Sequence, residues 1–417
     1  MKVTNIRVLI TIIVIGLLAG MIGIVLTELL HVVQQLAFGS GNSTTHTSFK
    51  ILVETSTPLH RLLVLLLCGV LTGLGWVLLH RYGSGITDIK KVIQNNAISM
   101  PIGTMILHPI LQIITVALGS PLGREVAPRE MSVALTTGWL KWTNWDTTLD
   151  NNTKRVLLAC AAGAGLAAVY NAPLSSTIFI LETLLLSWSM HHIIAALLSC
   201  SIATFVVRMG LGDTLQYPLS SVSFTDYLII WAALMGLCIG ISVHYFNKSF
   251  SKLSILPRTS WYMIPVSIVS FGIIGIMSIY FPEILGNGKP GVYLAFTTSL
   301  DWSYAVGLFA TKWGALLLAT IAGAYGGRIS PSMMLGSLLA FIGGAIWNSV
   351  LPLYTLPLEV CTVVGAATFL GCAQKMHLTA IIFLLELSRF SPSYFFPICI
   401  CMGTSMIIVE LCNKKSL

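Results

Sequence analysis

Residues 174–182 read LSSTIFILE, and residues 378–386 read LTAIIFLLE. These two segments lie 204 residues apart and share Leu, Ile, Phe, Leu and Glu at equivalent positions. Self-similarity at a fixed offset indicates an internal duplication. The pair therefore governs how the rest of the chain is divided.

Two further matches occur at almost the same offset. Gly123-Arg124-Glu125, with Pro128 soon after it, corresponds to Gly327-Arg328-Ile329, with Pro331 soon after it. Gly83-Ser84-Gly85-Ile86 corresponds to Gly286-Asn287-Gly288-Lys289, one residue out of register. One match alone could arise by chance in an apolar chain, but three matches in the same order favour a true duplication.

The composition indicates a membrane protein. The chain has 417 residues, of which 55% are apolar and 9% are charged, and its mean hydropathy is +0.87. A soluble domain uses about a quarter of its residues as Asp, Glu, Lys and Arg, so this composition excludes an ordinary soluble protein. The net charge of +8 comes from scarce acids, 15 against 23 bases, so nucleic acid is not an expected partner. The expected surroundings are a lipid bilayer.

Apolar stretches follow one another along almost the whole chain. Several are too short or too glycine-rich for a simple span of about 20 residues. Irregular backbone at membrane depth is tolerated where it is buried in protein or lines a cavity, so these breaks predict a ligand path. The stretches are 8–33, 61–80, 101–118, 156–185, 190–211, 227–246, 262–281, 305–324, 332–350, 359–373, 378–388 and 395–412.

The expected fold is an all-α polytopic membrane protein with one repeat at residues 1–210 and another at 211–417. If each half has an odd number of crossings, the repeats are inverted, and tilted and broken helices surround a mid-membrane anion pathway. Lys2 and Arg7 begin the chain, and its short tail after residue 411 is basic. The positive-inside rule therefore places both termini in the cytoplasm, with the protein in the cell membrane.

Each glycine-rich break precedes an apolar segment. Helix N-termini expose unpaired N–H groups and a partial positive charge, and glycine lets an ion approach the backbone closely. Several converging ends would bind an anion; the alternative is that the breaks serve helix packing alone. The breaks are GSGIT (83–87), LGREVAP (122–128), GNGKPG (286–291) and GGRISP (326–331).

Glu125 is the most informative charged residue, because an acid at membrane depth is costly unless it is paired or protonated. Its ionised carboxylate resembles an anion and could occupy an anion site, whereas the protonated side chain could move aside. The alternative is a structural interaction between Arg124 and Glu125. Ser84 has two interpretations as well: it caps a helix, or its hydroxyl contacts the ion.

These motifs resemble those of the CLC family of chloride channels and chloride/proton exchangers, over nearly the whole chain. The family's GSGIP resembles residues 83–87, its GREGP resembles 123–127, and its GxFxP resembles 327–331. The family's Asn-Ala-Pro stretch is present at 171–173. The resemblance is to short bacterial members without a cytoplasmic regulatory domain. Ser84 is kept, which disfavours the family's fluoride branch.

The resemblance implies a role for each matched residue. Ser84, within Gly83-Ser84-Gly85, and the amides of Arg328 and Ile329 would hold a central anion. The amides of Arg124, Glu125, Val126 and Ser330 would form an outer site. Glu125 would be the gate that also passes protons. The family is homodimeric, with one pathway per subunit. No cofactor and no metal are expected.

Four departures from the family pattern bear on this expectation. Thr183 stands where exchangers often carry a second, inward-facing glutamate, which weakens the case for coupling without excluding it. The helix that bears the family's ion-contacting tyrosine has no counterpart before the sequence ends. Arg328 replaces an apolar residue; it adds a positive charge beside the anion, or it points to a loop or pairs with an acid. Val126-Ala127 replaces Gly-Pro and could restrict the movement of Glu125.

The remaining polar residues favour structural interpretations. Lys312 is expected at a helix end or a dimer interface, and the nine cysteines are expected to be small core residues. The histidines show no shared spacing and are expected at helix ends or in loops; they include His60, His80, His108, His191, His192 and His377.

The leading hypothesis is exchange of chloride-like anions for protons, with Glu125 as the shared gate. A passive chloride channel of the same fold is the nearest alternative, supported by Thr183. A membrane scaffold without transport activity is a third possibility. An enzyme is not expected, because the apolar segments show no Asp pair, Ser–Lys pair or histidine-rich metal motif.

Overall fold

The computed structural model describes residues 5–39, 48–94, 100–213, 216–217, 225–297, 300–389 and 392–414. Lys2 and the last three residues of the basic tail lie outside them. The described chain is all helical, apart from one isolated backbone bridge. Its helices are α1 Ile6–Phe38, α2 Phe49–Thr55, α3 Pro58–Tyr82, α4 Ile89–Gln94, α5 Ile102–Ala117, α6 Val126–Trp142, α7 Asn151–Tyr170, α8 Pro173–Phe179, a π-helix Ile180–Leu185, α9 Met190–Leu211, α10 Tyr227–Ser251, α11 Met263–Tyr280, a 3-10 helix Pro282–Ile284, α12 Lys289–Phe296, α13 Trp302–Ile321, α14 Ile329–Val350, α15 Leu358–Gln374, α16 His377–Ser388, a 3-10 helix Pro392–Tyr394 and α17 Phe395–Lys414.

Length and composition make many of these helices suited to a bilayer. Within the described ranges, nine are long and apolar enough to cross a membrane: α1, α3, α7, α9, α10, α11, α13, α14 and α17. Large apolar side chains point outward from several of them, such as Leu17 and Val25 of α1 and Ile230 of α10. An outward-facing apolar surface of this kind suits lipid contact, so the expected all-α polytopic membrane fold is confirmed.

The chain forms two compact units that are interleaved in sequence. The first contains residues 1–32, 75–114 and 124–216, and the second contains 33–74, 115–123 and 217–417. Packing therefore divides the chain differently from sequence symmetry, and the repeat boundary between residues 210 and 211 stays a prediction.

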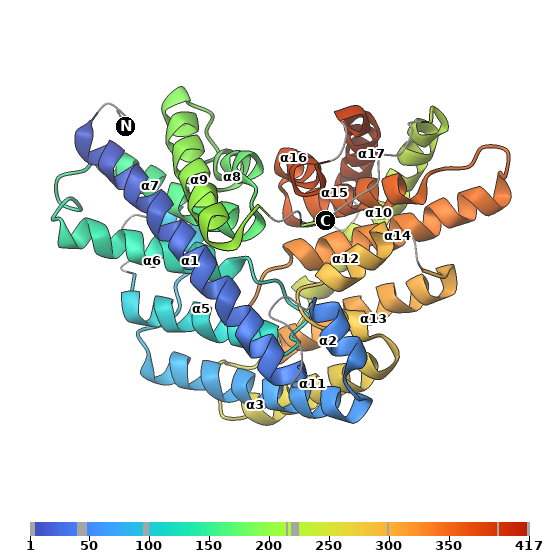
Figure 1. Cartoon of the computed structure of the whole chain (residues 1–417), viewed down its shortest axis with the longest axis horizontal. Coiled ribbons are helices and arrows are strands. Elements are labelled where there is room, and N and C mark those ends of the chain that lie inside the picture. Colours follow the sequence, from blue (N-terminus) through green and yellow to red (C-terminus); the bar gives the residue numbers. More distant parts are fainter. Residues whose placement is uncertain are drawn as a thin grey trace. The chain divides into compact units, whose positions relative to one another are not determined.

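Glycine governs helix packing in the first unit. In α1, a Cβ on Gly16 or Gly20 would lie within 2.6 Å of Ile202 or Val206 of α9. Small residues let helix backbones approach closely where lipid supplies no hydrophobic drive for association. Figure 1 shows α7, α8 and α9 (green) side by side in this unit.

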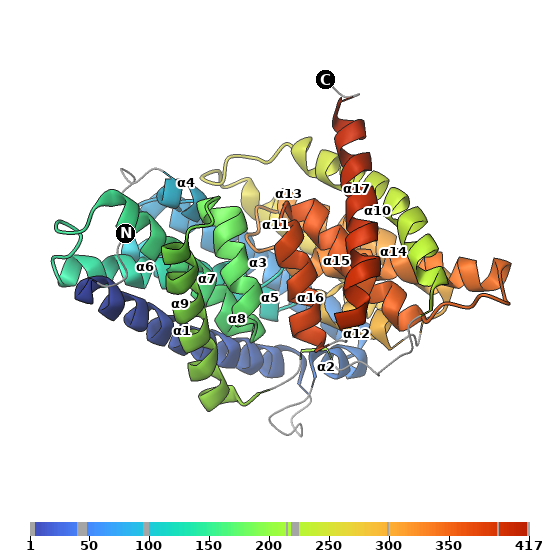
Figure 2. The ribbon, with the colours of Figure 1, turned by 90° about the horizontal axis from the view of Figure 1, so that it is seen from above.

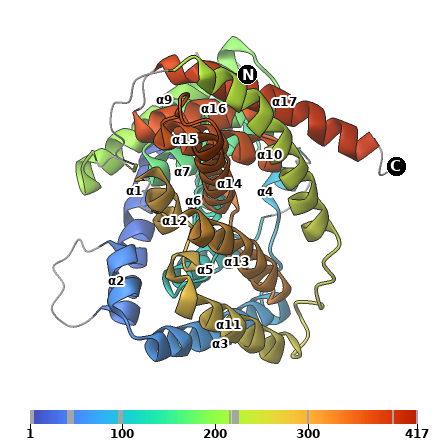
Figure 3. The same ribbon diagram turned by 90° about the vertical axis from the view of Figure 1, so that its right-hand side faces the viewer.

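Glycines also allow close helix packing in the second unit. Gly236 and Gly240 of α10 lie against α17, and Figure 2 shows these two helices together with α14 and α15. Gly336 of α14 and Gly365 of α15 face one another so closely that a Cβ on either would lie within 2.4 Å of the other's carbonyl oxygen. In Figure 3, α13 and α11 (yellow to brown) lie beside one another.

Backbone conformation recurs at the offset seen in the sequence. α7 ends at Asn171 with φ 56°, and α15 ends at Lys375 with φ 55°, 204 residues later. The next helices begin at Pro173 and His377, again 204 residues apart. Left-handed conformations at non-glycine residues are uncommon, so their recurrence supports the duplication.

Two details of the expected pattern were wrong. The stretch 156–185 is not continuous, because Asn171 breaks it into α7 and α8. The helix α6 was absent from the expected apolar stretches, because Arg129, Glu130 and Lys141 lower its hydropathy. These charges lie in the helix that begins after Glu125, so the omission falls at the candidate site.

Candidate functional site

Glu125 lies at the N-terminal end of α6, and its side chain is fully buried. The hydroxyl of Tyr170, the last residue of α7, donates a hydrogen bond of 3.3 Å to Glu125 Oε2. Tyr170 immediately precedes the Asn-Ala-Pro stretch and is itself buried. The predicted gate is thus a buried carboxylate, contacted by a residue that the sequence did not single out.

The close approach of α7 to α6 explains how Tyr170 reaches Glu125. A Cβ on Gly165 would lie 2.5 Å from the carbonyl oxygen of Pro128, in the first turn of α6. Asp150 begins α7 by accepting a hydrogen bond of 3.0 Å from the amide of Thr153. The hydrogen bonds from Thr153 hold the pKa of the Asp150 carboxyl below its usual range.

Arg129 supplies positive charge to this part of the first unit. Its guanidinium lies 4.7 Å from the centroid of the Phe179 ring. A cation over an aromatic face is stabilised by the ring quadrupole, so the Phe179 ring helps to hold the guanidinium of Arg129 in this unit.

The first glycine motif is a loop after α3, and α4 begins five residues after Ser84. A Cβ on Gly83 would lie 2.4 Å from the carbonyl oxygen of Leu79, and Gly85 has φ +85°, so both positions favour glycine. The amide of Ser84 donates to Thr104 Oγ1 at 3.2 Å. Asp88 accepts from the amide of Lys90 at the start of α4. Asp88, and not Ser84, therefore caps the start of α4, and contact of the Ser84 hydroxyl with an anion stays a prediction.

The third family motif, at residues 327–331, lies in the second unit, where α14 begins at Ile329 directly after Arg328. Ile329 and Ser330 are buried in its first turn. Gly327 pairs with Gly123 through two backbone hydrogen bonds of 2.7 and 2.8 Å, which form an isolated antiparallel bridge. These two glycines are equivalent in the sequence repeat, so the bridge has local two-fold symmetry.

Arg328 rests on an aromatic ring. Its guanidinium lies 4.6 Å from the centroid of the Phe250 ring, near the end of α10. This contact fixes a positive charge at the start of α14. Its effect on an anion stays a prediction.

The break 286–291 adjoins the third motif within the second unit. A Cβ on Gly288, which has φ +91°, would lie 3.3 Å from the carbonyl oxygen of Ser330. Lys312 donates to the carbonyl oxygens of Ile284 (2.8 Å) and Gly286 (3.1 Å) from the interior of α13, where it is fully buried. The expectation of a helix-end or interface lysine was wrong, because Lys312 holds this loop.

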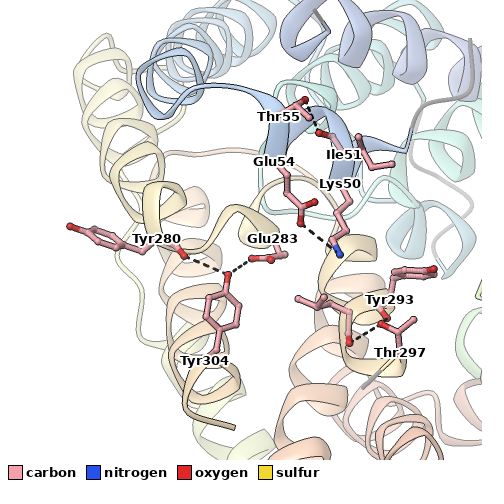
Figure 4. A network of polar contacts seen from close by, with 10 residues as sticks. Lys50, Ile51, Glu54, Thr55, Tyr280, Glu283, Tyr293, Thr297 and Tyr304 are labelled. Carbon is pink, nitrogen blue, oxygen red and sulfur yellow. Dashed lines mark hydrogen bonds and ion pairs between the residues drawn. The ribbon is translucent and has the colours of Figure 1, made fainter. Parts of the chain in front are cut away.

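Figure 4 shows polar contacts around Glu283, which lies in the short 3-10 helix before this loop. The hydroxyl of Tyr304 donates to Glu283 Oε2 at 2.7 Å, and Lys50 pairs with Glu54 in α2 at 3.7 Å. The bond from Tyr304 fixes Glu283 in the segment that leads into α12, whereas the Lys50–Glu54 pair lies within α2.

Thr183 lies within the π-helix that follows α8. Its hydroxyl donates to the carbonyl oxygen of Phe179 at 2.6 Å, and Arg155 donates to the carbonyl oxygen of Leu185 at 2.8 Å. Because its hydroxyl bonds to a carbonyl of its own helix, Thr183 does not present it to another element in this structure. π-helical turns are rare in proteins, and many of those that occur lie at functional sites.

His108 was expected at a helix end or in a loop, and this was wrong: it is fully buried within α5. It belongs to a polar cluster with Trp76, Gln112 and Glu130. Glu130 in the interior of α6 was the missed signal, because an ionisable residue inside a membrane helix is a functional candidate by default.

The all-helical fold with many apolar spans, and with a buried carboxylate at the start of a helix, defines a class of protein: a multi-pass membrane protein. Residues 68–410 match the family model described as voltage gated chloride channel, so the chain belongs to this family, the CLC family.

Known relatives agree with this assignment. The H(+)/Cl(−) exchange transporter ClcA of Vibrio parahaemolyticus is 27% identical over 408 residues, which cover 93% of this chain and 83% of the relative. A slow cyanobacterial Cl−/H+ antiporter has a similar structure, with a TM-score of 0.82 and 21% identity over 98% of this chain and 95% of that one. A CLC-type fluoride/proton antiporter has a TM-score of 0.76 and 19% identity, over 99% and 97%. The two structural likenesses show the fold.

Proposed function

We propose that the protein exchanges chloride or a similar small anion for protons across the cell membrane. The observation that carries this proposal is the fully buried carboxylate of Glu125 at the first turn of α6, with a hydrogen bond from Tyr170. A buried acid that is both an anion mimic and a proton acceptor can link two ion fluxes. The similarity to the Vibrio exchanger supports the same reaction.

In this mechanism, ionised Glu125 occupies the place that an anion would take at the N-terminus of α6. Protonation removes its charge, so the side chain leaves and an anion enters. Gly83 and Gly85 allow close backbone approach at Ser84. The other proposed anion contacts are Arg124, Val126, Arg328, Ile329 and Ser330. Since one carboxyl group does both tasks, anion entry requires proton binding.

The proposed assembly is a homodimer with one pathway per subunit and both termini in the cytoplasm. The family resemblance supports the dimer, and Arg7 and Lys414, near the two ends, support the orientation.

A passive chloride channel is the second candidate. Thr183 favours it, because its hydroxyl is bonded to its own helix and it carries no acid for a second proton step. A leak of anions without protons would require only the anion contacts.

Purified protein in liposomes distinguishes these candidates. An imposed chloride gradient should drive protons uphill in wild-type protein, and Glu125→Gln should abolish this proton movement while the protein stays folded. Anion flux without protons would favour the channel. Absence of any flux, with fluoride tested beside chloride, would favour a scaffold.

A further inference from the structure

Arg129 has hydrogen-bond donors that no protein group uses. In the described ranges, no hydrogen bond or ion pair joins its guanidinium to another residue, and Nε is buried without a partner. The central carbon of the guanidinium lies 4.7 Å from the centroid of the Phe179 ring of α8. A buried polar group without a hydrogen bond costs free energy, so this arrangement requires an explanation. The mechanism proposed above does not use Arg129.

The exposure of the three guanidinium nitrogens indicates where a partner could bind. Nε is buried, whereas the two terminal nitrogens are not among the buried atoms that lack a partner. Since they too form no hydrogen bond with the described chain, they border space that a small solute can reach. The residue as a whole is partly buried. Arg129 thus offers free N–H groups from a partly enclosed position.

The charge of Arg129 makes an anion the expected partner. An arginine side chain stays protonated in proteins, and its planar fork of N–H groups suits anions. Charged side chains inside membrane proteins are costly, and they commonly face a water-filled cavity and mark an ion pathway. A permanent cation with free donors therefore indicates a site for a small anion.

Glu125 is placed to pair with Arg129 but does not. It precedes Arg129 by four residues and has helical backbone dihedral angles, so the two side chains leave the same face of α6. A glutamate four residues before a basic residue is the favourable order for an ion pair on a helix. The Glu125 carboxylate instead accepts a hydrogen bond from Tyr170. The guanidinium therefore remains open about 6 Å further along the helix axis than the gate.

The adjacent acid does not pair with Arg129 either. Glu130 Oε2 lies 3.3 Å from His108 Nε2 and 2.7 Å from the amide nitrogen of Gln112, both on α5. Successive residues of a helix point about 100° apart, so Glu130 faces α5 while Arg129 lies over Phe179. No carboxylate of the described chain thus neutralises Arg129 by direct contact.

We propose that Arg129 binds the transported anion at a further site, one helical turn beyond Glu125 and outside all the family motifs. The inference rests on the proposed anion transport. The occupant is a small inorganic anion such as chloride, held by the terminal N–H groups of the guanidinium. The Phe179 ring supports the guanidinium from one face and leaves these N–H groups free.

This site would act on the gate. An anion at Arg129 and an ionised Glu125 are two negative charges beside one cation, so each weakens the binding of the other. Removal of the Glu125 charge ends this competition. Anion binding at Arg129 should therefore be stronger in Glu125→Gln than in the wild type.

Bromide locates such a site directly. In crystals of the full chain grown with sodium bromide, we expect an anomalous peak within hydrogen-bonding distance of the terminal nitrogens of Arg129, and a stronger peak there in Glu125→Gln. A map with bromide elsewhere in the protein but none at Arg129 would overturn the inference and leave the proposed function intact. If wild-type protein binds no bromide anywhere and moves no anion in liposomes, the proposed function fails together with the inference.

Calorimetric titration with chloride tests the same group in solution. Arg129→Gln removes the charge, so the apparent chloride affinity should fall about tenfold. Arg129→Lys keeps the charge and should recover part of this loss. The control Lys141→Gln removes an exposed positive charge near the end of the same helix and should bind chloride as the wild type does.

Equal chloride affinities of wild type and a folded Arg129→Gln protein would contradict the proposed site. If Arg129→Gln fails to fold, the bromide map of wild-type protein still tests the site, because it needs no substitution.

Discussion

At the residue scale, the Tyr170 hydroxyl holds Glu125 in its buried position, which the proposed mechanism treats as the closed gate. Tyr170→Phe removes the hydrogen bond to Oε2 and nothing else of the side chain. The bond is long, so its loss should weaken this position by about 1 kcal/mol and raise anion flux about fivefold at neutral pH. Initial flux rates in liposomes measure this, with Tyr227→Phe on α10 as control. An unchanged rate would mean that Tyr170 does not hold the gate.

The positive charge of Arg328 can also be tested. Its guanidinium on Phe250 brings a positive charge to the first turn of α14. Arg328→Gln should weaken chloride binding about fivefold, which corresponds to about 1 kcal/mol. Calorimetric titration of the purified protein with chloride measures this.

Phe250→Leu keeps the charge but removes the ring that positions it, so its effect on chloride binding should be smaller than that of Arg328→Gln. Equal chloride affinity in wild type and Arg328→Gln would contradict the assigned role.

The sequence alone predicted some residues of the candidate site and missed others. Glu125 could be predicted because an acid beside a glycine-rich helix start is chemically distinctive. Tyr170 could not, because its contact spans 45 residues and depends on the packing of α7. Lys312 and His108 were misjudged for the same reason: their partners come from other helices.

At the element scale, the approach of α7 to α6 depends on a missing Cβ. In Gly165→Ala, the new methyl group would lie 2.5 Å from a carbonyl oxygen of α6. This should cost about 1–3 kcal/mol and displace the start of α6. The loss should appear as a lower unfolding temperature in detergent and a lower anion flux.

Gly138→Ala is the matched control, because it changes the same residue type within α6 itself. Its Cβ would make an ordinary contact of 3.6 Å with Ile102. Alanine is the better helix former by up to about 1 kcal/mol, so this variant should be neutral or slightly stabilised. Equal losses in the two variants would contradict the close-packing account.

The loop before α12 depends on a buried ammonium group. Lys312→Met keeps the length of the side chain but leaves two buried carbonyl groups without this donor. We expect a loss of about 1–3 kcal/mol in unfolding free energy. Denaturant titration in detergent measures it, and the exposed Lys252→Met should show little change. A Lys312→Met protein of wild-type stability would refute the holding role of the lysine.

Elements were predicted best where they were apolar and long. The stretches 190–211 and 359–373 match α9 and α15 closely. The helix α6 was missed because its charged residues lower its hydropathy, although the fold buries it. The break between α7 and α8 escaped because Asn171 adopts a left-handed conformation that composition does not reveal.

At the scale of the whole molecule, the duplication is visible in both sequence and backbone. The bridge between Gly123 and Gly327 joins equivalent residues, as a local two-fold axis requires. The sequence offset of 204 predicts this pairing only if the repeats are related by such an axis. Opposed orientation of the repeats and a shared anion pathway stay predictions.

The central claim is that one chain couples anion movement to proton movement. The reversal potential in planar bilayers, with equal chloride and a pH gradient across the membrane, tests it most directly. Exchange predicts a reversal potential that differs from zero and moves with the pH gradient, and Glu125→Gln should return it to zero. A wild-type reversal potential of zero at every pH gradient would contradict the account and identify a passive anion pathway.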